Sequence, residues 1–501
     1  MEADITTATK NTHYDVLILG SGQAGNPLAV ALAARGKRTA MIERNAVGGT
    51  CINYGCTPTK TMVASAEIAY LAGRGREFGV NIGSIHVDMA AVRERKRKMV
   101  KSWREGGEKH LAKGAVDLIR GEASFLAPKT PGVKLILVRL NEGGELHLTA
   151  DLVVIDTGLT GNPPPLPGLD TVPFLDNVSI MELDQVPEHL LILGGGYIGL
   201  EFGQMFRRFG SRVTIVQDGA QLLTQEDEDI AEEITKILHE DGIEVLLSTH
   251  ATSAGSSGES DQRRVRLTVT SGGAERILEG SHLLIATGRK PNTARLNLAA
   301  AGVATNARGF IPVDDKLETN VPGIYATGDV NGGPAFTHIS YDDFRILNAN
   351  LSGDSSPDTA DGARAKSDAP GHSAGSPART TKGRLLPYCV FLDPQLGRVG
   401  LSEKQATEKG VKVRVARLPM ASVARSLETG QTRGFMKALV DPETQQILGA
   451  AVLGQDGGEI MAMLQIAMMG KLRYTELQNA VLAHPTLAES LNKLFSTFDG
   501  E

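Results

Sequence analysis

The stretch Tyr14-Asp15-Val16-Leu17-Ile18-Leu19-Gly20-Ser21-Gly22-Gln23-Ala24-Gly25 joins an apolar strand to a turn rich in glycine. A helix to about Arg35 and a second strand, Arg38 to Ile42, follow and end at Glu43. Small residues at such a turn let the backbone approach a pyrophosphate at the helix N-terminus, while the carboxylate binds ribose hydroxyls. A chance glycine-rich turn would lack this context. The sequence therefore predicts an α/β fold with a dinucleotide site at Gly20, Gly22, Gly25 and Glu43.

The same pattern occurs a second time. A strand from Leu190 to Leu193 leads into Gly194-Gly195-Gly196-Tyr197-Ile198-Gly199, which is followed by a helix to about Phe209 and a strand from Arg212 to Val216. The glycines keep the spacing of the first set. Two dinucleotide sites in one chain imply two nucleotide cofactors that exchange electrons. A duplicated fold with an empty second site is the alternative.

The residue after the second strand differs between the two units. Gln217 occupies the place that Glu43 holds in the first unit. A carboxylate at this place repels a 2′-phosphate and favours NAD, whereas an arginine favours NADP. Glutamine does neither, so the sequence leaves the nicotinamide preference open, with the adjacent Asp218 leaning toward NAD.

A cysteine pair lies between the two fingerprints, in Gly48-Gly49-Thr50-Cys51-Ile52-Asn53-Tyr54-Gly55-Cys56-Thr57-Pro58-Thr59-Lys60. Two cysteines at this spacing can close a small disulfide that is easily reduced and formed again. An apolar helical segment, Thr61 to Leu71, follows, and a thiolate near a helix start has a depressed pKa because unpaired backbone N–H groups stabilise it. Lys60 adds a cation. The stretch therefore predicts redox chemistry.

Two other interpretations of the cysteine pair are less favoured. A zinc site needs further cysteine or histidine ligands at short spacing, and the third cysteine, Cys389, lies far along the chain. Two unrelated core thiols would not require the surrounding glycines and lysine. We therefore predict no resident metal site.

Length and charge limit the class of protein. A chain of 501 residues is long enough for about three domains, and a net charge of -6 argues against a nucleic-acid surface. The basic run Arg93 to Lys98 is interleaved with acidic residues and is expected to be a solvated helix face between Val92 and Lys113. Three cysteines, no signal peptide and no apolar run of membrane-spanning length predict a soluble, cytoplasmic protein with a loose tail over residues 1–12.

Later stretches connect these units. Strands are expected around Leu118, over Leu135 to Leu140 and over Leu152 to Ile155, before Thr157-Gly158. The proline-rich run Asn162 to Gly168 then indicates a crossing between domains, and Leu283 to Asn292, with Thr287-Gly288, returns the chain to the first. Thr327-Gly328-Asp329 places a carboxylate at a strand end, which suits a bond to a cofactor hydroxyl, although a turn-capping aspartate has the same pattern.

The last part of the chain follows a change in composition. Residues from Leu351 to Arg384 are mostly Ser, Gly, Ala, Asp and Pro, which predicts a disordered linker or surface loop. Beyond it we expect four strands, over Tyr388 to Leu392, Lys412 to Arg417, Gly434 to Val440 and Gln446 to Leu453. Two helices are expected to follow, over Gly458 to Met468 and Glu489 to Phe495.

A histidine motif, Ala483-His484-Pro485-Thr486-Leu487-Ala488-Glu489, separates the last two of these helices. A histidine that is held by the carboxylate of Glu489 suits a general acid or base. In isolation, a structural His-Pro turn is the alternative.

The order of these motifs closely resembles the flavin-dependent pyridine nucleotide-disulfide oxidoreductases. The two fingerprints, Gly-Gly-Thr-Cys-x4-Cys-x-Pro-x-Lys, Ala-Thr-Gly-Asp and His-Pro-Thr carry the resemblance, which covers the chain apart from the tail and the insert. It implies two Rossmann-like dinucleotide-binding domains and a C-terminal α+β dimerisation domain. We expect an FAD-binding domain over 13–162 and 285–350, an NAD(P)-binding domain over 163–284, an insert over 351–384 and a dimerisation domain over 385–501.

The resemblance also implies roles for individual residues. The first fingerprint with Glu43 would bind the ADP half of FAD, and Asp329 would bond its ribityl chain. The second fingerprint and Gln217 would bind NAD(P)H, with Tyr197 as a lid over the nicotinamide pocket. The cofactor-binding set comprises Gly20, Gly22, Gly25, Glu43, Gly49, Thr50, Lys60, Thr157, Gly158, Gly194, Gly196, Tyr197, Gly199, Gln217, Gly288 and Asp329.

The catalytic set implied by the resemblance contains six residues. Hydride passes to the flavin and electrons pass on to the disulfide, with Cys56 facing the flavin and Cys51 meeting the substrate. Lys60 would pair with Glu201 beside the flavin ring. His484 and Glu489 would come from the partner subunit of a homodimer, where they exchange a proton with Cys51.

The electron acceptor is predicted from finer details. The stretches Thr57 to Lys60, Phe336 to Asp343 and His484 to Phe495 look most like the mercuric-reductase-like branch, which includes reactive-chlorine-resistance flavoproteins that reduce metal ions such as copper(II). The chain lacks the C-terminal cysteine pair with which mercuric reductases hand over Hg(II), and an N-terminal metal-binding domain with its own cysteines. We therefore expect a metal-ion reductase of stress defence, Cu(II) or Hg(II) being the acceptor.

Three alternatives remain open. The His484 motif with Glu489 is also the dihydrolipoamide dehydrogenase arrangement, which makes that activity the second candidate. Glutathione reduction is less favoured because no arginine stands at Gln217 or Leu223. A non-enzymatic flavoprotein that acts as a redox sensor or binding partner is a third possibility. His338 is interpreted as a satisfied buried histidine, with a metal contact as the alternative.

Overall fold

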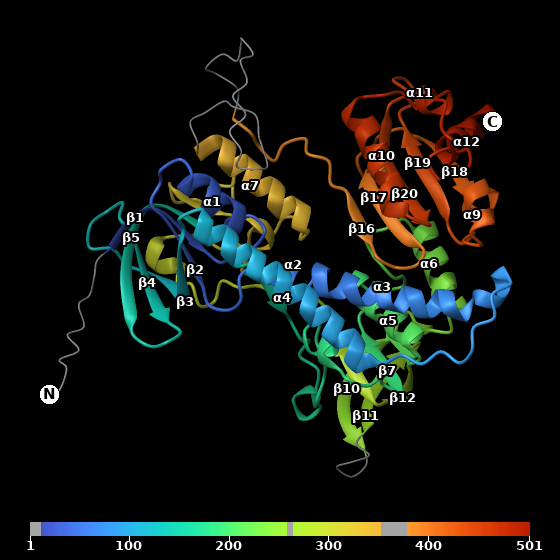
Figure 1. Ribbon diagram of the computed structural model, residues 1–501, viewed down its shortest axis with the longest axis horizontal. Helices are drawn as coiled ribbons and strands as arrows, with labels where there is room; N and C mark the ends of the chain where they lie inside the picture. Colours follow the sequence, from blue (N-terminus) through green and yellow to red (C-terminus); the bar gives the residue numbers. More distant parts are fainter. Residues whose placement is uncertain (1–11, 258–263, 352–377, 501) are drawn as a thin grey trace. The chain divides into compact units, whose positions relative to one another are not determined.

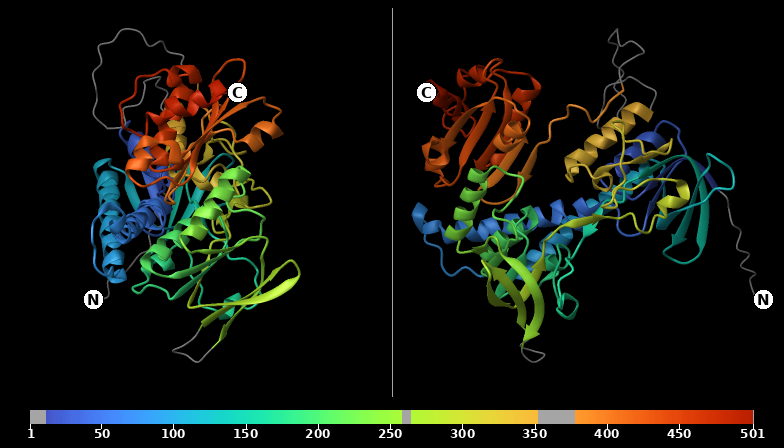
Figure 2. Two further views of the ribbon diagram at one scale, coloured as in Figure 1. Left: turned by 90° about the vertical axis from the view of Figure 1, so that its right-hand side faces the viewer. Right: turned by 180° about the vertical axis from the view of Figure 1, so that it is seen from behind.

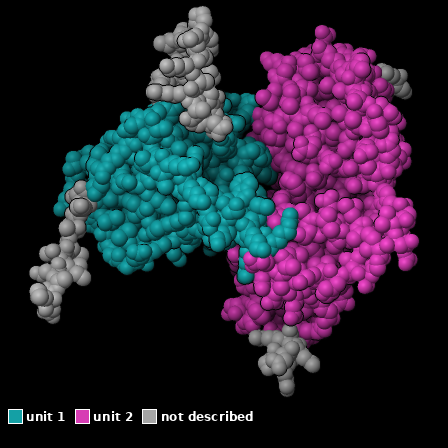
Figure 3. Space-filling model, in the orientation of Figure 1, with its two compact units in different colours: residues 1–59, 95–162, 289–384 teal, residues 60–94, 163–288, 385–501 magenta. Residues whose placement is uncertain are grey.

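The computed structural model describes residues 12–257, 264–351 and 378–500 (Figure 1). The chain divides into two compact units, which Figure 3 colours separately. Unit 1 comprises residues 1–59, 95–162 and 289–384, and unit 2 comprises residues 60–94, 163–288 and 385–501. Two helices, α3 (Cys56–Gly73) and α4 (Met89–Lys113), run across the boundaries between these ranges.

Unit 1 is built on a six-stranded sheet. β1 pairs in parallel with both β2 and β5, β15 adds to β5, and β3 and β4 complete the order β1-β2-β3-β4-β5-β15. β6 and β14 form a separate, two-stranded antiparallel sheet. The strands are β1 (Thr12–Leu19), β2 (Thr39–Glu43), β3 (Asp117–Leu126), β4 (Lys134–Leu140), β5 (Glu145–Ile155), β6 (Leu159–Gly161), β14 (Arg289–Pro291) and β15 (Ile324–Ala326).

Both faces of the central strands of this sheet are buried. Val16 and Ile18 of β1 pack into one apolar cluster, with residues of α1 (Gly25–Ala33) and α7 (Thr337–Leu351). Leu17 and Leu19 point the other way, into a second cluster. Side chains alternate across a strand, so an uninterrupted apolar run fits a strand that is covered on both sides. The helices α1 and α7 lie side by side (Figure 1).

Unit 2 contains three further sheets. A parallel sheet has the order β13-β7-β8-β9, an antiparallel sheet the order β10-β11-β12, and a five-stranded antiparallel sheet the order β16-β17-β20-β19-β18. The first two are green in Figure 2 and the third is orange to red. Their strands are β7 (His189–Leu193), β8 (Arg212–Val216), β9 (Glu244–Leu246), β10 (His250–Ser257), β11 (Arg264–Ser271), β12 (Ala274–Gly280), β13 (His282–Ile285), β16 (Tyr388–Val390), β17 (Gln395–Gly400), β18 (Arg414–Pro419), β19 (Phe435–Val440) and β20 (Ile447–Gly454).

Helices pack against these sheets. α5 contacts β7 and β8, and α10 contacts β17 and β20. The helices of unit 2 are α5 (Tyr197–Phe209), α6 (Glu228–Glu240), α8 (Glu403–Glu408), α9 (Ala424–Glu428), α10 (Gly457–Met469), α11 (Tyr474–Gln478) and α12 (Ser490–Ser496). Unit 1 holds in addition the short helix α2 (Gly49–Asn53).

The strands and helices expected around both fingerprints are confirmed to within a few residues. The helix after the cysteine pair begins at Cys56, earlier than the expected start at Thr61. Most of the predicted insert lies outside the described residues, which resume at residue 378, as does the tail except Thr12, the first residue of β1. Beyond the insert, Arg384 Nη1 lies 2.7 Å from the buried carboxylate of Asp343.

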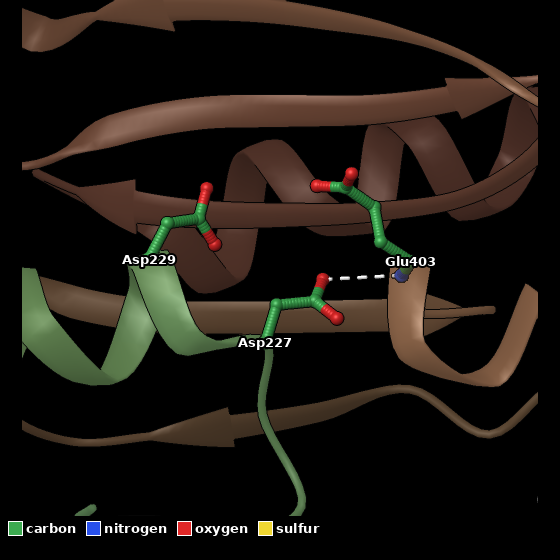
Figure 4. A group of neighbouring side chains, drawn as sticks. All are labelled: Asp227, Asp229 and Glu403. Carbon is green, nitrogen blue, oxygen red and sulfur yellow. Dashed lines mark hydrogen bonds between the residues drawn. The ribbon is translucent and has the colours of Figure 1, made fainter. Parts of the chain in front are cut away.

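A buried lysine joins three elements of unit 2. Lys437 on β19 is 1% exposed, and its Nζ lies 2.9 Å from Asp227, 2.7 Å from Asp229 and 2.7 Å from Glu403. The three carboxylates converge in Figure 4, where the Glu403 N–H also donates to Asp227. Burial lowers the pKa of Lys437, but the hydrogen bonds to Asp229, Glu403 and Asp227 outweigh it, and the net pKa is raised. The ammonium thus supplies the cation that this acidic cluster requires.

We expect Lys437→Met to lower the free energy of unfolding by roughly 3–5 kcal/mol, because it leaves partly buried carboxylates without their cation. The exposed Lys404 on α8 provides the matched control, and Lys404→Met should change stability by less than about 0.5 kcal/mol. Urea unfolding followed by circular dichroism measures both variants. Equal unfolding midpoints for the two variants would contradict this role of Lys437.

Candidate active site

The first glycine turn fits against the carboxyl end of β5. A Cβ atom at Gly20, whose φ is +101°, would lie 2.3 Å from the carbonyl oxygen of Asp156. A Cβ atom at Gly22 or at Gly25 would meet the Asp156 carboxylate, at 2.7 Å and 2.8 Å. No larger side chain fits at these positions, which leaves the backbone at the start of α1 open to a phosphate.

Glu43 at the end of β2 holds this turn in place. Its Oε2 accepts hydrogen bonds from Ser21 N at 3.0 Å and Ser21 Oγ at 2.7 Å, while Oε1 accepts one from Asn45 N at 2.7 Å. Gly49 and Thr50 begin α2 beside the turn, since a Cβ atom at Gly49 would lie 2.9 Å from Gly22 Cα. The predicted members of the first nucleotide site are therefore brought together.

Two buried hydroxyl groups of unit 1 face no protein partner. Thr157 Oγ1 and Thr327 Oγ1 are buried without a hydrogen-bond partner among the described residues. The backbone carbonyls of Thr157 and Gly158 accept from Asn292, at 2.9 Å and 3.0 Å. Because buried hydroxyls are normally satisfied, the two threonines fit a site that is completed by a bound nucleotide such as FAD.

Asp329 lies in a short 3₁₀ turn, Gly328–Asn331, after β15. Its Oδ2 is 3.2 Å from Arg289 Nη1. Burial raises the pKa of Asp329, and Arg289 offsets part of that rise. The backbone N–H of Gly328 donates instead to Asp343 at 2.9 Å, so it is Asp343 that caps this turn. The carboxylate of Asp329 is thus held by a cation at a strand end, which fits its predicted contact with a cofactor hydroxyl.

The two cysteines lie on two successive helices, Cys51 in the middle of α2 and Cys56 at the start of α3. Cys51 is in α2 and partly buried, and Cys56 is the first residue of α3 and exposed. Gly55 permits the tight connection, because a Cβ atom there would lie 3.0 Å from Thr50 O. Thr337, at the start of α7, places its Oγ1 3.3 Å from Cys56 Sγ. A hydroxyl donor stabilises a thiolate. No sequence pattern connects Thr337 with the cysteines, because only the fold brings α7 close to Cys56.

The predicted pair of Lys60 and Glu201 is formed within unit 2. Lys60 Nζ lies 2.6 Å from Glu201 Oε2, and Glu201 is only 4% exposed. The other carboxylate oxygen accepts the Phe391 N–H at 2.9 Å, and the Lys60 ammonium lies over the Phe391 ring at 4.8 Å. The cation and the backbone donor together offset the cost of burying the negative charge of Glu201. Burial and then Glu201 raise the pKa of the neighbouring Cys389 to about 12, so Cys389 remains a protonated thiol.

The second glycine turn repeats the geometry of the first. Gly194 has a φ of +115°, and a Cβ atom there would lie 2.5 Å from Ala286 O. Gln217 Oε1 accepts the Gly195 N–H at 2.8 Å, as Glu43 accepts that of Ser21. Gln217 therefore makes the same backbone hydrogen bond as Glu43 but carries no negative charge.

The remaining members of the second site lie around the start of α5. Gly196 is the N-cap residue, and a Cβ atom there would meet nothing within 4 Å, so the approach to the helix is open. Gly199 packs on the turn, since its Cβ atom would be 2.1 Å from Gly194 O. Tyr197 is exposed at the helix start, and Gly288, with a φ of +145°, follows β13. These features fit a bound dinucleotide.

The C-terminal histidine is held by the predicted carboxylate. His484 Nδ1 lies 2.8 Å from Glu489 Oε2 and 3.1 Å from Oε1, and the His484 side chain is 67% exposed. A carboxylate at Nδ1 fixes the ring so that Nε2 faces outward. His338 is also exposed, so the interpretation of it as a buried histidine is wrong. Its ring stacks on that of Phe336, with the centroids 5.5 Å apart.

Two nucleotide cradles and a cysteine pair on two successive helices define a class, the flavoprotein oxidoreductases that transfer electrons through a disulfide. The chain belongs to the pyridine nucleotide-disulphide oxidoreductase family, whose model matches residues 14–343. The dimerisation domain of the same family matches residues 386–495. Members of this family use FAD and NAD(P)H, so this protein is an FAD- and NAD(P)-dependent oxidoreductase.

Three relatives indicate where the chain lies within the family. A probable pyridine nucleotide-disulfide oxidoreductase, RclA of Escherichia coli, is 38% identical and covers 96% of this chain and 99% of its own. Its Cu(II) complex, described as an HOCl-induced flavoprotein disulfide reductase, superposes with a TM-score of 0.83 over 97% of this chain and 99% of that one, at 37% identity. The mercuric reductase of Bacillus cereus is 35% identical, over 98% of this chain and 72% of its own. The dihydrolipoyl dehydrogenase of Bacillus subtilis is 31% identical, over 96% and 98%.

None of the helices within the described residues is both long and apolar enough to cross a membrane.

Removal of the hydroxyl beside Cys56 should weaken its thiolate. In a Cys51→Ser background, we expect Thr337→Val to raise the pKa of the Cys56 thiol by about one unit, because a hydrogen bond to a charged acceptor is lost. Thr337→Ser keeps the hydroxyl and serves as the matched control. The pH dependence of iodoacetamide alkylation of Cys56 measures the pKa. The same pKa in the valine and serine variants would contradict a hydrogen bond to the thiolate.

Proposed function

We propose that this protein oxidises NAD(P)H and passes the electrons through the Cys51–Cys56 pair to a metal ion in stress defence, with Cu(II) as the favoured acceptor and Hg(II) as the second. The observation that carries the proposal is the cysteine pair on α2 and at the start of α3, beside the first glycine turn. Soft thiolates are suited to hold copper and mercury ions.

FAD, when bound, supplies the step that converts hydride transfer into disulfide reduction. The chain's own contribution begins at Cys56. When the disulfide breaks, two electrons enter it, and Cys56 is left as a thiolate that Thr337 stabilises. The ion pair of Lys60 and Glu201 holds one positive and one negative charge in fixed positions next to the first turns of α3.

The return of the cysteines to the disulfide balances the reaction. The two thiolates give up two electrons, one to each of two Cu(II) ions, and the S–S bond forms again. With Hg(II) as the acceptor, both electrons reduce one ion to the metal. The single proton of the Cys51 thiol needs an acceptor before the disulfide forms again, and the imidazole of His484, oriented by Glu489, provides it.

We place this histidine opposite the cysteines of the partner subunit, so that the active site is complete only in a homodimer. The exposed position of His484 on the family's dimerisation domain supports this arrangement. The NAD(P)H site falls to Gly194, Gly196 and Gly199 with Tyr197. Asp218 beside Gln217 favours NADH, since a carboxylate repels a 2′-phosphate.

The choice of a metal acceptor rests on the relatives and on the residues after His484. An RclA structure is described as a Cu(II) complex, and the mercuric reductases are close in sequence. Between Glu489 and Glu501 the chain contains no cysteine, so a second thiol pair for delivery of Hg(II) is absent from this stretch, and Cu(II) is favoured over Hg(II). A cysteine pair that must be re-reduced in each cycle suits the reducing cytoplasm.

Oxidation of dihydrolipoyl groups is the second candidate. The bond from His484 to Glu489 and the similarity to dihydrolipoyl dehydrogenase favour it. Gln217 makes this activity less favoured, because dihydrolipoyl dehydrogenases are NAD-linked and usually have an acidic residue at the position of Gln217.

Two features can be tested, the metal ion as electron acceptor and the Cys51–Cys56 pair as the route of the electrons. The purified FAD-loaded protein should oxidise NADH in the presence of Cu(II) and be inactive with lipoamide, and NADPH should support slower turnover. Cys51→Ser and Cys56→Ser should each lower the metal-dependent rate by more than about 100-fold while FAD stays bound, since a thiol pair is needed to carry two electrons. The partly buried Cys389 provides the control, and Cys389→Ser should retain most of the activity.

Absorbance of NAD(P)H at steady state measures all of these rates. Full metal-dependent turnover in either cysteine variant would refute the proposed route. Turnover with lipoamide and none with a metal ion would instead assign the protein to the dihydrolipoyl dehydrogenases.

A further inference from the structure

Asp156 is a buried carboxyl group in the floor of the first nucleotide cradle. It is the residue directly after β5, and its Oδ2 accepts the Gly25 N–H at 2.7 Å. Gly25 is the first residue of α1, so this amide belongs to the helix terminus that faces the pyrophosphate. Cβ atoms at Gly22, Gly25 and Gly328 would all lie within about 3 Å of the same carboxyl group. The glycines of two separate turns thus enclose Asp156.

The surroundings of Asp156 are acidic. Three further carboxyl groups face it from neighbouring elements, Glu43 at the end of β2, Asp329 in the turn after β15, and Asp343 on α7. The two nearby cations are already engaged, Arg289 with Asp329 and Arg384 with Asp343. No lysine or arginine within the described ranges forms an ion pair with Asp156. A bound dinucleotide would add a diphosphate to this set of negative groups.

A buried carboxylate with a single backbone donor and no cation is costly, and a neutral carboxylic acid avoids that cost. Burial raises the pKa of Asp156 well above its ordinary value, and the three neighbouring carboxyl groups raise it further, whereas the Gly25 N–H opposes the rise. Burial and the neighbouring negative charges therefore shift the pKa of Asp156 in the same direction. Both favour the protonated form, and a diphosphate dianion next to it favours that form more strongly.

We propose that Asp156 is a positioning residue for FAD that holds a proton while the cofactor is bound, and that it makes FAD affinity depend on pH. The neutral acid fastens the first turn of α1 to the end of β5 without repelling the diphosphate. The ionised form keeps the bond to Gly25 and repels the cofactor. FAD therefore binds the protonated apoprotein preferentially, and loss of the proton releases it.

This inference concerns FAD itself and is independent of the electron acceptor. The affinity of the apoprotein for FAD should fall by up to about tenfold for each pH unit above the pKa of Asp156. Asp156→Asn keeps the shape and the acceptor for Gly25 N–H but has no charge in any state. Its FAD affinity should stay constant from about pH 5 to about pH 9, and at the upper end it should exceed that of the natural protein.

Quenching of FAD fluorescence on binding to the apoprotein measures the dissociation constant. Asp151→Asn is the matched control, because Asp151 is an exposed carboxylate on β5, the strand that Asp156 follows, and this variant should keep the pH profile of the natural protein. Thermal unfolding of the apoproteins provides a second reading. The folded state binds the proton of Asp156 more tightly than the unfolded chain, so the natural protein should lose stability as the pH rises. Asp156→Asn should lose less stability over the same range, because only the contributions of the remaining carboxyl groups with raised pKa values, such as Asp329 and Asp343, persist in it.

Identical pH profiles of FAD affinity for the natural protein and Asp156→Asn would overturn the proposal, and Glu43, Asp329 or Asp343 would then account for any pH dependence. A flat profile in the natural protein would overturn it as well. If Asp156→Asn fails to fold, Asp156→Ser offers a smaller neutral side chain, and a folded serine variant that keeps the natural pH profile would also contradict it.

Discussion

The close approach of a glycine to a backbone carbonyl is the constraint on which both nucleotide cradles depend. Gly20 is pressed against the carbonyl of Asp156, and Gly194 against that of Ala286, at the ends of β5 and β13. A Cβ atom would collide with the carbonyl in each case, so the turn can pass between two parallel strands only where glycine stands. The following helix then starts with its N–H groups directed at the place of a pyrophosphate.

The two glycine turns share this arrangement down to single hydrogen bonds. In the first, Glu43 accepts the Ser21 N–H, and in the second, Gln217 accepts the Gly195 N–H. The side-chain oxygen at the end of the second strand therefore has a structural task besides ligand recognition. Glutamine at this place makes the same hydrogen bond as the acid and carries no negative charge.

The sequence sufficed to predict the elements that carry the chemistry. Glycine spacing and apolar runs predicted both fingerprints, and the pairs Lys60 with Glu201 and His484 with Glu489 followed from the family resemblance and are present within hydrogen-bond distance. Local patterns were sufficient in these cases because strand, turn and helix follow one another in the chain. The start of α3 was placed too late, since Cys56-Thr57-Pro58 has weak helical propensity and only the proline in the first turn signals a helix start.

Residues brought in from distant segments were not predicted. Thr337 reaches Cys56 through the packing of α7, and Asp156 lies under the first glycine turn because β5 pairs with β1. His338 lies on the exposed side of α7, which a sequence without a clear helical period did not reveal. These positions depend on tertiary pairing, and no spacing rule connects them with the motifs they serve.

If the Cys51–Cys56 pair stores electrons in addition to the flavin, the oxidised protein takes up four electrons, because flavin and disulfide each accept two. Anaerobic titration of the oxidised, FAD-loaded protein with dithionite counts these electrons. We expect consumption of about two equivalents of dithionite per FAD, with two new thiols detected after denaturation. Complete reduction by about one equivalent, with no gain of thiols, would contradict the storage of electrons in the cysteine pair.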